Sequence, residues 1–426
     1  MASRRRESSA EPEEVEEERD GAEEEEEGRG GGVGMEEQRE ISRIYFTPGM
    51  FGFGRLGPYS YFSHLEKAIE KHFAAAGREA QTFILDVPPT ASIRRRAGRL
   101  AELIANTCEE DGVLGPIHLV GHSTGGLDAR LVASPSAVLP VEPDAMRWLP
   151  RLASVTTMNT PHFGTPLASF FATVSGQRML YAVSALTVIA LGLGAPPLAA
   201  ASALVIAVGR LDRALGVELG MLDRATDALM RVLDDARRRE VRLYLEAIRE
   251  DQGSIIQVTP EAMDLFQCGV ENRPGLRYQS TASMAPPPTP TQWMRTLGGP
   301  WSVISAPLFA SLYSLTARWD ERYPCAAPSA GPETEAMLAR AFQRSPGARA
   351  NDGVVPIRSQ LWGKLVWCGY GDHLDVLGHF RDAHGVASHV DWLASGAEFQ
   401  RSGFEALTRA VARGMLEGEG APASLL

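Results

Sequence analysis

Between residues 41 and 133, short segments rich in β-branched and aromatic residues alternate with segments whose apolar residues recur at helical spacing. This alternation predicts strands at 41–46, 82–87 and 117–120 and helices at 61–76, 93–109 and 126–133. Strands that are apolar throughout are buried on both faces, so the pattern favours a mostly parallel sheet with helices on both faces. The sequence therefore predicts an α/β fold wound by right-handed crossovers.

The rest of the chain extends this pattern. We expect strands at 152–158, 276–282 and 365–370, helices within 210–250 and at 301–317 and 398–416, and irregular segments at 286–290 and 324–332. Of the 426 residues, 44% are hydrophobic, which is enough to bury one large core. We therefore expect one catalytic domain over residues 39–426.

Negative charge is concentrated at the start of the chain. Residues 1–40 contain 16 acidic residues and six arginines, so they carry nearly all of the net charge of −11. Residues 1–38 lack the apolar content that offsets the entropy of ordering, and we expect a disordered acidic tail there. Because the remainder is almost neutral, nothing in the charge favours nucleic-acid binding.

Two features bear on the compartment. The arginines at positions 4–6 precede a Glu-rich run instead of the apolar segment of a cleaved export signal. The four cysteines are irregularly spaced, with no metal-binding pattern: Cys108, Cys268, Cys325 and Cys368. We expect a cytoplasmic protein with reduced thiols, either free or membrane-associated.

Residues 179–209 contain no charged side chain. The stretch is long enough to span a bilayer, but Pro196 and Pro197 divide it into two pieces that are each short for spanning. We expect a hairpin of two apolar helices that forms a lipid-facing lid over the active site. Ordinary core packing and a true transmembrane segment are the alternatives.

The strongest local signal is the sequence Gly121-His122-Ser123-Thr124-Gly125, which directly follows an expected strand and precedes an expected helix. Glycines flank the serine because a strained strand-to-helix turn leaves no room there for side chains. The Ser123 hydroxyl then projects above the sheet as a nucleophile. The backbone N–H of Thr124, at a helix N-terminus, can stabilise an oxyanion.

A serine nucleophile needs a histidine base with an orienting carboxylate, which follow it in the order acid and then histidine in this motif class. Asp352 lies in a turn-prone Asn-Asp-Gly sequence, and His373 follows the strand expected at 365–370. We select Asp352 and His373 as the pair. Asp372 and Asp375 compete for the acid's role, but a carboxylate one or two positions from a histidine seldom orients its ring end-on.

The loop after the first strand supplies the second oxyanion donor. Gly49 and Gly52 let the backbone approach a ligand closely, which makes the N–H of Met50 the natural candidate. His122 and His162 flank the expected pocket, and His379 follows soon after His373. We interpret most of the other histidines as structural.

At these residues the chain resembles the bacterial triacylglycerol lipases of the α/β-hydrolase superfamily, over roughly residues 41–395. Four blocks carry the likeness: residues 48–52 at the oxyanion loop, 121–126 at the nucleophile, 160–165 after the next strand, and the paired blocks 351–355 and 372–375. The resemblance implies an α/β-hydrolase fold, Ser123, Asp352 and His373 as a catalytic triad, and Met50 and Thr124 as oxyanion donors. It also implies that an insertion at about 166–250 is the lid.

The sequence departs from the family at several points. Pro48 replaces the usual His, an acidic tail is present, no export signal is seen, and the lid is unusually apolar. Some relatives bind a structural calcium through a carboxylate two residues after the catalytic histidine, here Asp375. The matching upstream acid would be Glu333 or Glu335, in the irregular segment expected there, so only half of a calcium site is visible.

These observations predict a serine carboxylic-ester hydrolase of apolar acyl groups that needs no cofactor. A lipid acyltransferase or an intracellular polyester depolymerase with the same triad is the first alternative. A non-catalytic scaffold anchored by residues 179–209 is an alternative of another class. The expected partners are a lipid or small ester substrate and, through residues 179–209, a membrane or lipid-droplet surface.

Overall fold

The protein is described from a computed structural model. The structure describes residues 40–50, 55–56, 59–111, 115–193, 227–228, 230–231, 233–289, 291, 300–327, 329–381, 391 and 393–420. The acidic tail predicted for residues 1–38 lies outside the described residues.

Six strands form one sheet in the order β4-β1-β5-β6-β7-β8. They are β1 (Ser42–Thr47), β4 (Ala80–Ile84), β5 (Ile117–His122), β6 (Leu152–Met158), β7 (Arg277–Met284) and β8 (Lys364–Tyr370). All five pairings are parallel, which confirms the expected α/β layout. Two short strands, β2 (Arg55–Leu56) and β3 (Tyr59–Ser60), pair separately and antiparallel.

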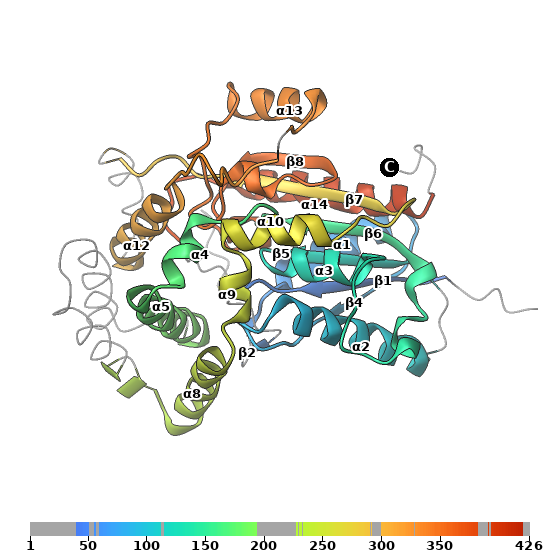
Figure 1. Ribbon diagram of the computed structural model, residues 1–426, viewed down its shortest axis with the longest axis horizontal. Coiled ribbons are helices and arrows are strands. Elements are labelled where there is room, and N and C mark those ends of the chain that lie inside the picture. The colour runs from blue at the N-terminus through green and yellow to red at the C-terminus, as the bar shows by residue number, and fades with distance from the viewer. Residues whose placement is uncertain are drawn as a thin grey trace, which may run out of the picture. The chain divides into compact units, whose positions relative to one another are not determined.

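Helices cover both faces of the sheet (Figure 1). They are α1 (Ser63–Ala75) and α14 (Arg401–Gly418) on one face, and α2 (Ile93–Asp111) and α3 (Gly125–Ala133) on the other. Alternate residues of a strand point to opposite faces. Accordingly Ile44 and Phe46 pack in the cluster with α1 and α14, whereas Tyr45 packs in the cluster with α2 and α3.

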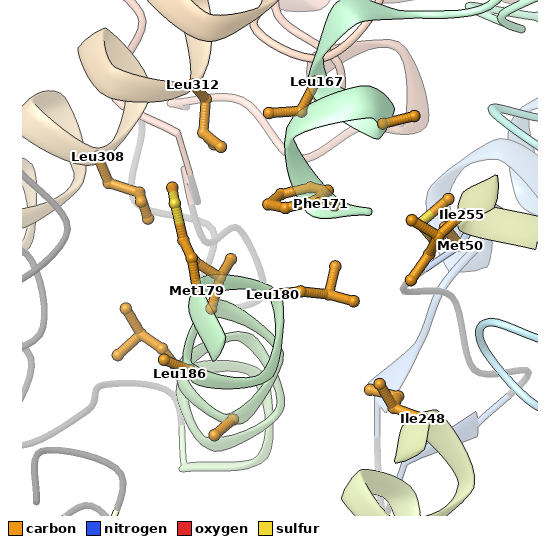
Figure 2. Close-up of a cluster of buried hydrophobic side chains, with 14 of the residues drawn as sticks. Met50, Leu167, Phe171, Met179, Leu180, Leu186, Ile248, Ile255, Leu308 and Leu312 are labelled. Atoms are coloured by element: carbon orange, nitrogen blue, oxygen red, sulfur yellow. The ribbon is translucent and has the colours of Figure 1, made fainter. Parts of the chain in front are cut away.

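Further helices gather beyond the ends of the strands (Figure 1). Between β6 and β7 the described helices are α4 (Pro166–Phe171), α5 (Val174–Leu193), α8 (Asp235–Glu250), α9 (Gly253–Gln257) and α10 (Pro260–Gly269). Between β7 and β8 lies α12 (Pro300–Thr316). We call α4, α5, α8, α9 and α12 the cap helices, because their apolar side chains form one cluster together with Met50 (Figure 2).

The apolar segment at 179–209 begins within α5. Its side chains Met179, Leu180, Val183 and Leu186 are buried among the other cap helices. In the described part of the chain, no helix has both the length and the apolar content that a membrane crossing requires. For its first eight residues, packing within the cap therefore accounts for the apolar character. The prolines and the expected second helix lie outside the described residues.

One sequence prediction was wrong. The segment around Glu333 and Glu335 was expected to be irregular, but it forms the first turn of α13 (Pro332–Phe342). Pro332 stands at the first helical position, where its missing N–H costs nothing and its fixed φ suits the helix. Four 3-10 helices complete the described elements: η1 (Pro143–Met146), η2 (Leu149–Arg151), η3 (Ile357–Gln360) and η4 (Asp375–Leu377).

Candidate active site

Ser123 occupies a sharp turn between β5 and α3. Its φ is 54°, a left-handed conformation that is strained for a residue with a side chain. The turn is held by the Ser123 N–H, which donates to the Met158 oxygen of β6 at 2.9 Å. The flanking glycines are required, because a Cβ at Gly121 or Gly125 would lie 2.2 or 2.1 Å from a backbone oxygen. The two glycines therefore permit the turn that presents the serine.

The structure brings Asp352 and His373 together from the loops that follow α13 and β8. The Nδ1 of His373 lies 2.7 Å from Oδ2 of Asp352, and both side chains are buried. A carboxylate accepts, so Nδ1 carries the proton and leaves Nε2 as the basic nitrogen. The His373 N–H also donates to the backbone oxygen of Asp352 at 3.0 Å. The ring thus has the tautomer that a general base requires.

Two amide side chains that the sequence analysis missed also donate hydrogen bonds to the Asp352 carboxylate. Nδ2 of Asn159 donates to Oδ2 of Asp352 at 2.9 Å, and Nε2 of Gln360 donates to the same oxygen at 3.2 Å. The other oxygen accepts the N–H groups of Val354 and Val355 at 2.9 and 2.7 Å. Nothing in the local pattern signals this role, because Asn159 is 193 positions from Asp352 and Gln360, eight positions away, belongs to no motif.

The competing carboxylates are engaged elsewhere. Oδ1 of Asp372 accepts the N–H groups of Leu374 and Asp375, and its Oδ2 accepts the hydroxyl of Ser395 at 2.8 Å. Asp375 accepts the N–H of Asp372 at 2.8 Å. These hydrogen bonds hold the loop around His373 in its conformation.

The oxyanion loop passes close to the nucleophile. A Cβ at Gly49 would lie 2.7 Å from Cβ of Ser123, so the loop backbone approaches the serine more closely than any other residue would allow. Met50 and Thr124, the predicted donors, both line the cavity above Ser123. The backbone segments of Met50 and Thr124 therefore lie at the same cavity as Ser123.

A buried ion pair, also missed in the sequence, anchors this loop. Nε of Arg96 on α2 donates to Oδ2 of Asp128 on α3 at 2.8 Å, and Nη2 of Arg96 donates to the backbone oxygen of Pro48. Both side chains are fully buried, and burial raises the pKa of Asp128 to about 6 against the opposing charge of Arg96. A signal was present, since charged residues within otherwise apolar helical faces usually have buried partners.

One cavity of about 100 Å³ opens above Ser123 and His373. Its walls are almost wholly apolar: Leu167, Ala168 and Phe171 of α4, Val183 of α5, and Leu308 and Leu312 of α12. Figure 2 shows the cap side chains converging beside Met50. The sequence analysis expected the lid at 166–250 and did not foresee that α12 contributes to the same wall.

The candidate histidines occupy different surroundings. His379 lines the cavity, and His122 packs against His373. His162 is buried beside Arg130, with its Nε2 3.0 Å from the Thr157 hydroxyl. Burial and then the charge of Arg130 lower the pKa of His162 well below its usual value, so this ring is neutral and packs as part of the core.

Within the described residues, no three His, Cys, Asp or Glu side chains are grouped in a way that could hold a metal ion. Glu335, one of the acids considered for calcium, forms an ion pair with Arg358, which lowers the pKa of that carboxyl. Asp375 is buried, and burial followed by the charges of Asp372 and Asp391 raises its pKa.

The serine turn after β5, the Asp–His pair beyond α13 and β8, and the parallel sheet beneath them define the α/β-hydrolase fold. Two curated relatives are similar to this chain over 125 residues: the triacylglycerol lipase of Pseudomonas fragi, at 29% identity, and that of Vibrio cholerae serotype O1, at 30%. The expected similarity to bacterial triacylglycerol lipases is thereby confirmed over 125 residues.

The matched segment is 29% of this chain and 36% and 34% of the two relatives, so the chain spans about a third of their length. No protein-family model matches the chain. Among solved structures, EstA of Clostridium botulinum aligns with 86% of this chain and 88% of its own, at 18% identity and a TM-score of 0.46.

Proposed function

We propose that this protein is a serine hydrolase of carboxylic esters with apolar acyl groups. His373, oriented by Asp352, takes the proton of Ser123 as the hydroxyl attacks the ester carbonyl. The N–H groups of Met50 and Thr124 stabilise the tetrahedral oxyanion, and an acyl-enzyme forms as the alcohol leaves. Water activated by the same histidine then releases the acid. This chemistry needs no cofactor, and we expect chelators to leave the rate unchanged.

The observation that carries the proposal is that the nucleophile, its base and an apolar cavity lie together. The strained Ser123 turn and the His373–Asp352 pair meet at one cavity whose walls are apolar. A strained serine turn persists only where the surrounding structure compensates for it, and such strain clusters at functional sites. The apolar walls favour an acyl chain over a polar substrate. The relatives named as triacylglycerol lipases support the same class of substrate.

The first experiment is labelling with a fluorophosphonate, followed by peptide mapping and rates on p-nitrophenyl esters of short and long acyl chains. We expect a single adduct at Ser123, faster turnover of long chains, and loss of both label and activity in Ser123→Ala. An unlabelled wild-type protein would leave only the scaffold role. Incubation with an alcohol acceptor separates the hydrolase from an acyltransferase, because the latter would form the new ester.

We further propose that the segment between β6 and β7, which includes residues 179–209, contacts a lipid surface peripherally. Among the described residues, seven large hydrophobic side chains are exposed, and four of them lie between β6 and β7. These are Val174, Leu243, Ile256 and Leu265. They lie on α5, α8, α9 and α10, and each would bring apolar area to a lipid interface.

Liposome flotation tests this contact. Replacing Val174, Leu243, Ile256 and Leu265 together by serine is expected to reduce flotation, because each removes apolar area that would enter the interface. Val138→Ser is the matched control, since Val138 is 78% exposed and lies outside this region. Equal flotation of both variants and the wild type would argue against the contact.

A further inference from the structure

The side chain of His122 connects the nucleophile turn to the loop that carries His373. His122 is fully buried, and its Nε2 lies 2.9 Å from the backbone oxygen of His373. Its Nδ1 lies 2.8 Å from the hydroxyl of Tyr61. The ring centroids of His122 and His373 are 4.6 Å apart. Both nitrogens of His122 are therefore engaged.

The chemistry of the partners determines the direction of both bonds. A backbone oxygen only accepts, so Nε2 of His122 carries a proton and donates to His373. Burial, and then the nearby charge of His373, lower the pKa of His122 well below its usual value. The ring is therefore neutral, its Nδ1 is a lone pair, and the hydroxyl of Tyr61 donates to it.

Tyr61 extends the connection to the oxyanion loop. The Tyr61 hydroxyl lies against the backbone of Gly49, where a Cβ would come within 3.3 Å of the hydroxyl oxygen. Because that hydroxyl donates to His122, its lone pairs remain for the side that faces Gly49. Burial raises the pKa of Tyr61, so the hydroxyl keeps its proton. The resulting series of contacts runs from Gly49 to Tyr61 and then, through two hydrogen bonds, to His122 and His373.

This series joins three parts of the site that are far apart in sequence. Gly49 directly precedes the oxyanion donor Met50, and His122 directly precedes Ser123. At its far end, His373 has its backbone oxygen held by His122 and its N–H held by Asp352. A displacement of about 1 Å among reacting groups can cost about 10²-fold in rate.

We propose that Tyr61 and His122 are positioning residues that hold the oxyanion loop, Ser123 and the His373 backbone in the geometry for catalysis. The inference rests on the proposed ester hydrolysis. Neither residue touches the proton that moves in the reaction. Their loss is therefore expected to lower kcat and to leave KM nearly unchanged, because Tyr61→Phe preserves the apolar ring that lines the cavity.

A double-mutant cycle tests the shared action of the two residues. Tyr61→Phe is expected to lower kcat about tenfold, and His122→Leu about 10²-fold. In the His122→Leu background, Tyr61→Phe should have a clearly smaller effect than in the wild type, because the link to His373 is already gone and only the contact with Gly49 is left to lose. Multiplication of the two losses in the double variant would overturn the proposal.

A conservative variant and two controls separate positioning from simple stability. His122→Gln keeps an N–H donor near the Nε2 position and is expected to recover most of the kcat lost in His122→Leu. Tyr45→Phe is the matched tyrosine control, because its hydroxyl is 2.7 Å from Thr107, on the side of α2. His118→Gln removes a buried histidine of the same strand, whose partners are Ser154 and Glu419. Both controls should change the free energy of unfolding but not kcat.

A readout without substrate distinguishes this inference from the proposed function. The ¹⁵N spectrum of labelled histidine should show His122 as the neutral tautomer protonated at Nε2, with Tyr61→Phe shifting its Nδ1 signal. A ring protonated at Nδ1 would overturn the inference even if the enzyme is active. Full esterase activity of Ser123→Ala would refute the proposed function, and the spectrum would still test the hydrogen-bond series.

Discussion

At the scale of single residues, the geometry of the candidate site depends on the hydrogen bonds that the carboxylate of Asp352 accepts. It accepts hydrogen bonds from five groups, one of which is Nδ1 of His373. A buried carboxylate with this many donors stays in one orientation, and so does the imidazole that it holds. Asp372 accepts from three groups, the N–H groups of Leu374 and Asp375 in its own loop and the hydroxyl of Ser395.

Asp352→Asn is expected to lower kcat by about 10³- to 10⁴-fold, because an amide favours the wrong histidine tautomer. Asp372→Asn keeps an acceptor oxygen for its loop and should cost less than about tenfold. Ester hydrolysis rates and urea unfolding of both variants provide the measurement. A larger loss in Asp372→Asn would transfer the acid's role to that residue.

Gly49→Ala tests the close approach of the oxyanion loop. The added Cβ would lie 2.7 Å from Cβ of Ser123, so the loop must move away from the serine. We expect kcat to fall about 10²-fold. Gly269→Ala is the control, since a Cβ there meets nothing within 4 Å. Equal rates for the wild type and Gly49→Ala would show that the loop does not serve the oxyanion.

At the scale of elements, α12 reaches the site although it is far in sequence from the other cap helices. Leu308 and Leu312 of α12 line the cavity together with Phe171 of α4 and Val183 of α5. Figure 2 shows these two leucines on the side of Phe171 away from Met50. Helices from two separate insertions thus form a single wall. We expect substrate preference to depend on both insertions.

Leu312→Ala is expected to shift the preference toward longer acyl chains, because it removes apolar volume from the cavity wall. Each additional methylene that becomes buried contributes about 0.8 kcal/mol, so kcat/KM for long relative to short esters should rise severalfold. The control is Leu338→Ala, a buried residue of α13 in a separate cluster. It should lower stability by about 2–5 kcal/mol without changing the preference. Identical selectivity in Leu312→Ala and the wild type would exclude α12 from the acyl site.

At the scale of residues 39–426 as a whole, the end of α14 is tied to β1 and β5. The carboxylate of Glu419, just after α14, accepts from Nε2 of His118 at 2.8 Å and from the Ser42 hydroxyl at 2.5 Å. Nη2 of Arg78 lies 2.9 Å from its other oxygen. Burial alone would raise the pKa of Glu419, but these hydrogen bonds and the Arg78 charge outweigh it and lower the pKa.

A lowered pKa in the folded state makes the Glu419 contribution to stability complete above the ordinary pKa of about 4.5, and the contribution is lost as pH falls through the lower folded value. Glu419→Gln should therefore reduce the free energy of unfolding at pH 7, with the difference from wild type shrinking below about pH 4.5. Urea unfolding across this range measures it. Glu405→Gln, an exposed position on α14, is the control. A difference that is constant with pH would exclude the carboxylate.

The sequence by itself determined the order of strands and helices, the Ser123 turn and the choice of Asp352 and His373 as candidates. These depend on periodicity and turn chemistry, which act between near neighbours in the chain. One local signal led to a wrong prediction. Pro332 was expected to end an irregular segment, but it is the first residue of α13.

Only the tertiary structure decided which distant side chains complete the site. Asn159 and Arg96 reach their partners from 193 and 32 positions away, and Gln360 reaches Asp352 from eight positions away. The role of α12 in the cavity depends in the same way on the packing of two insertions. The hydrophobic pattern of a segment indicates which face of the helix or strand is buried. Which other element covers that face follows from three-dimensional packing, because contacts between distant segments leave no period in the sequence.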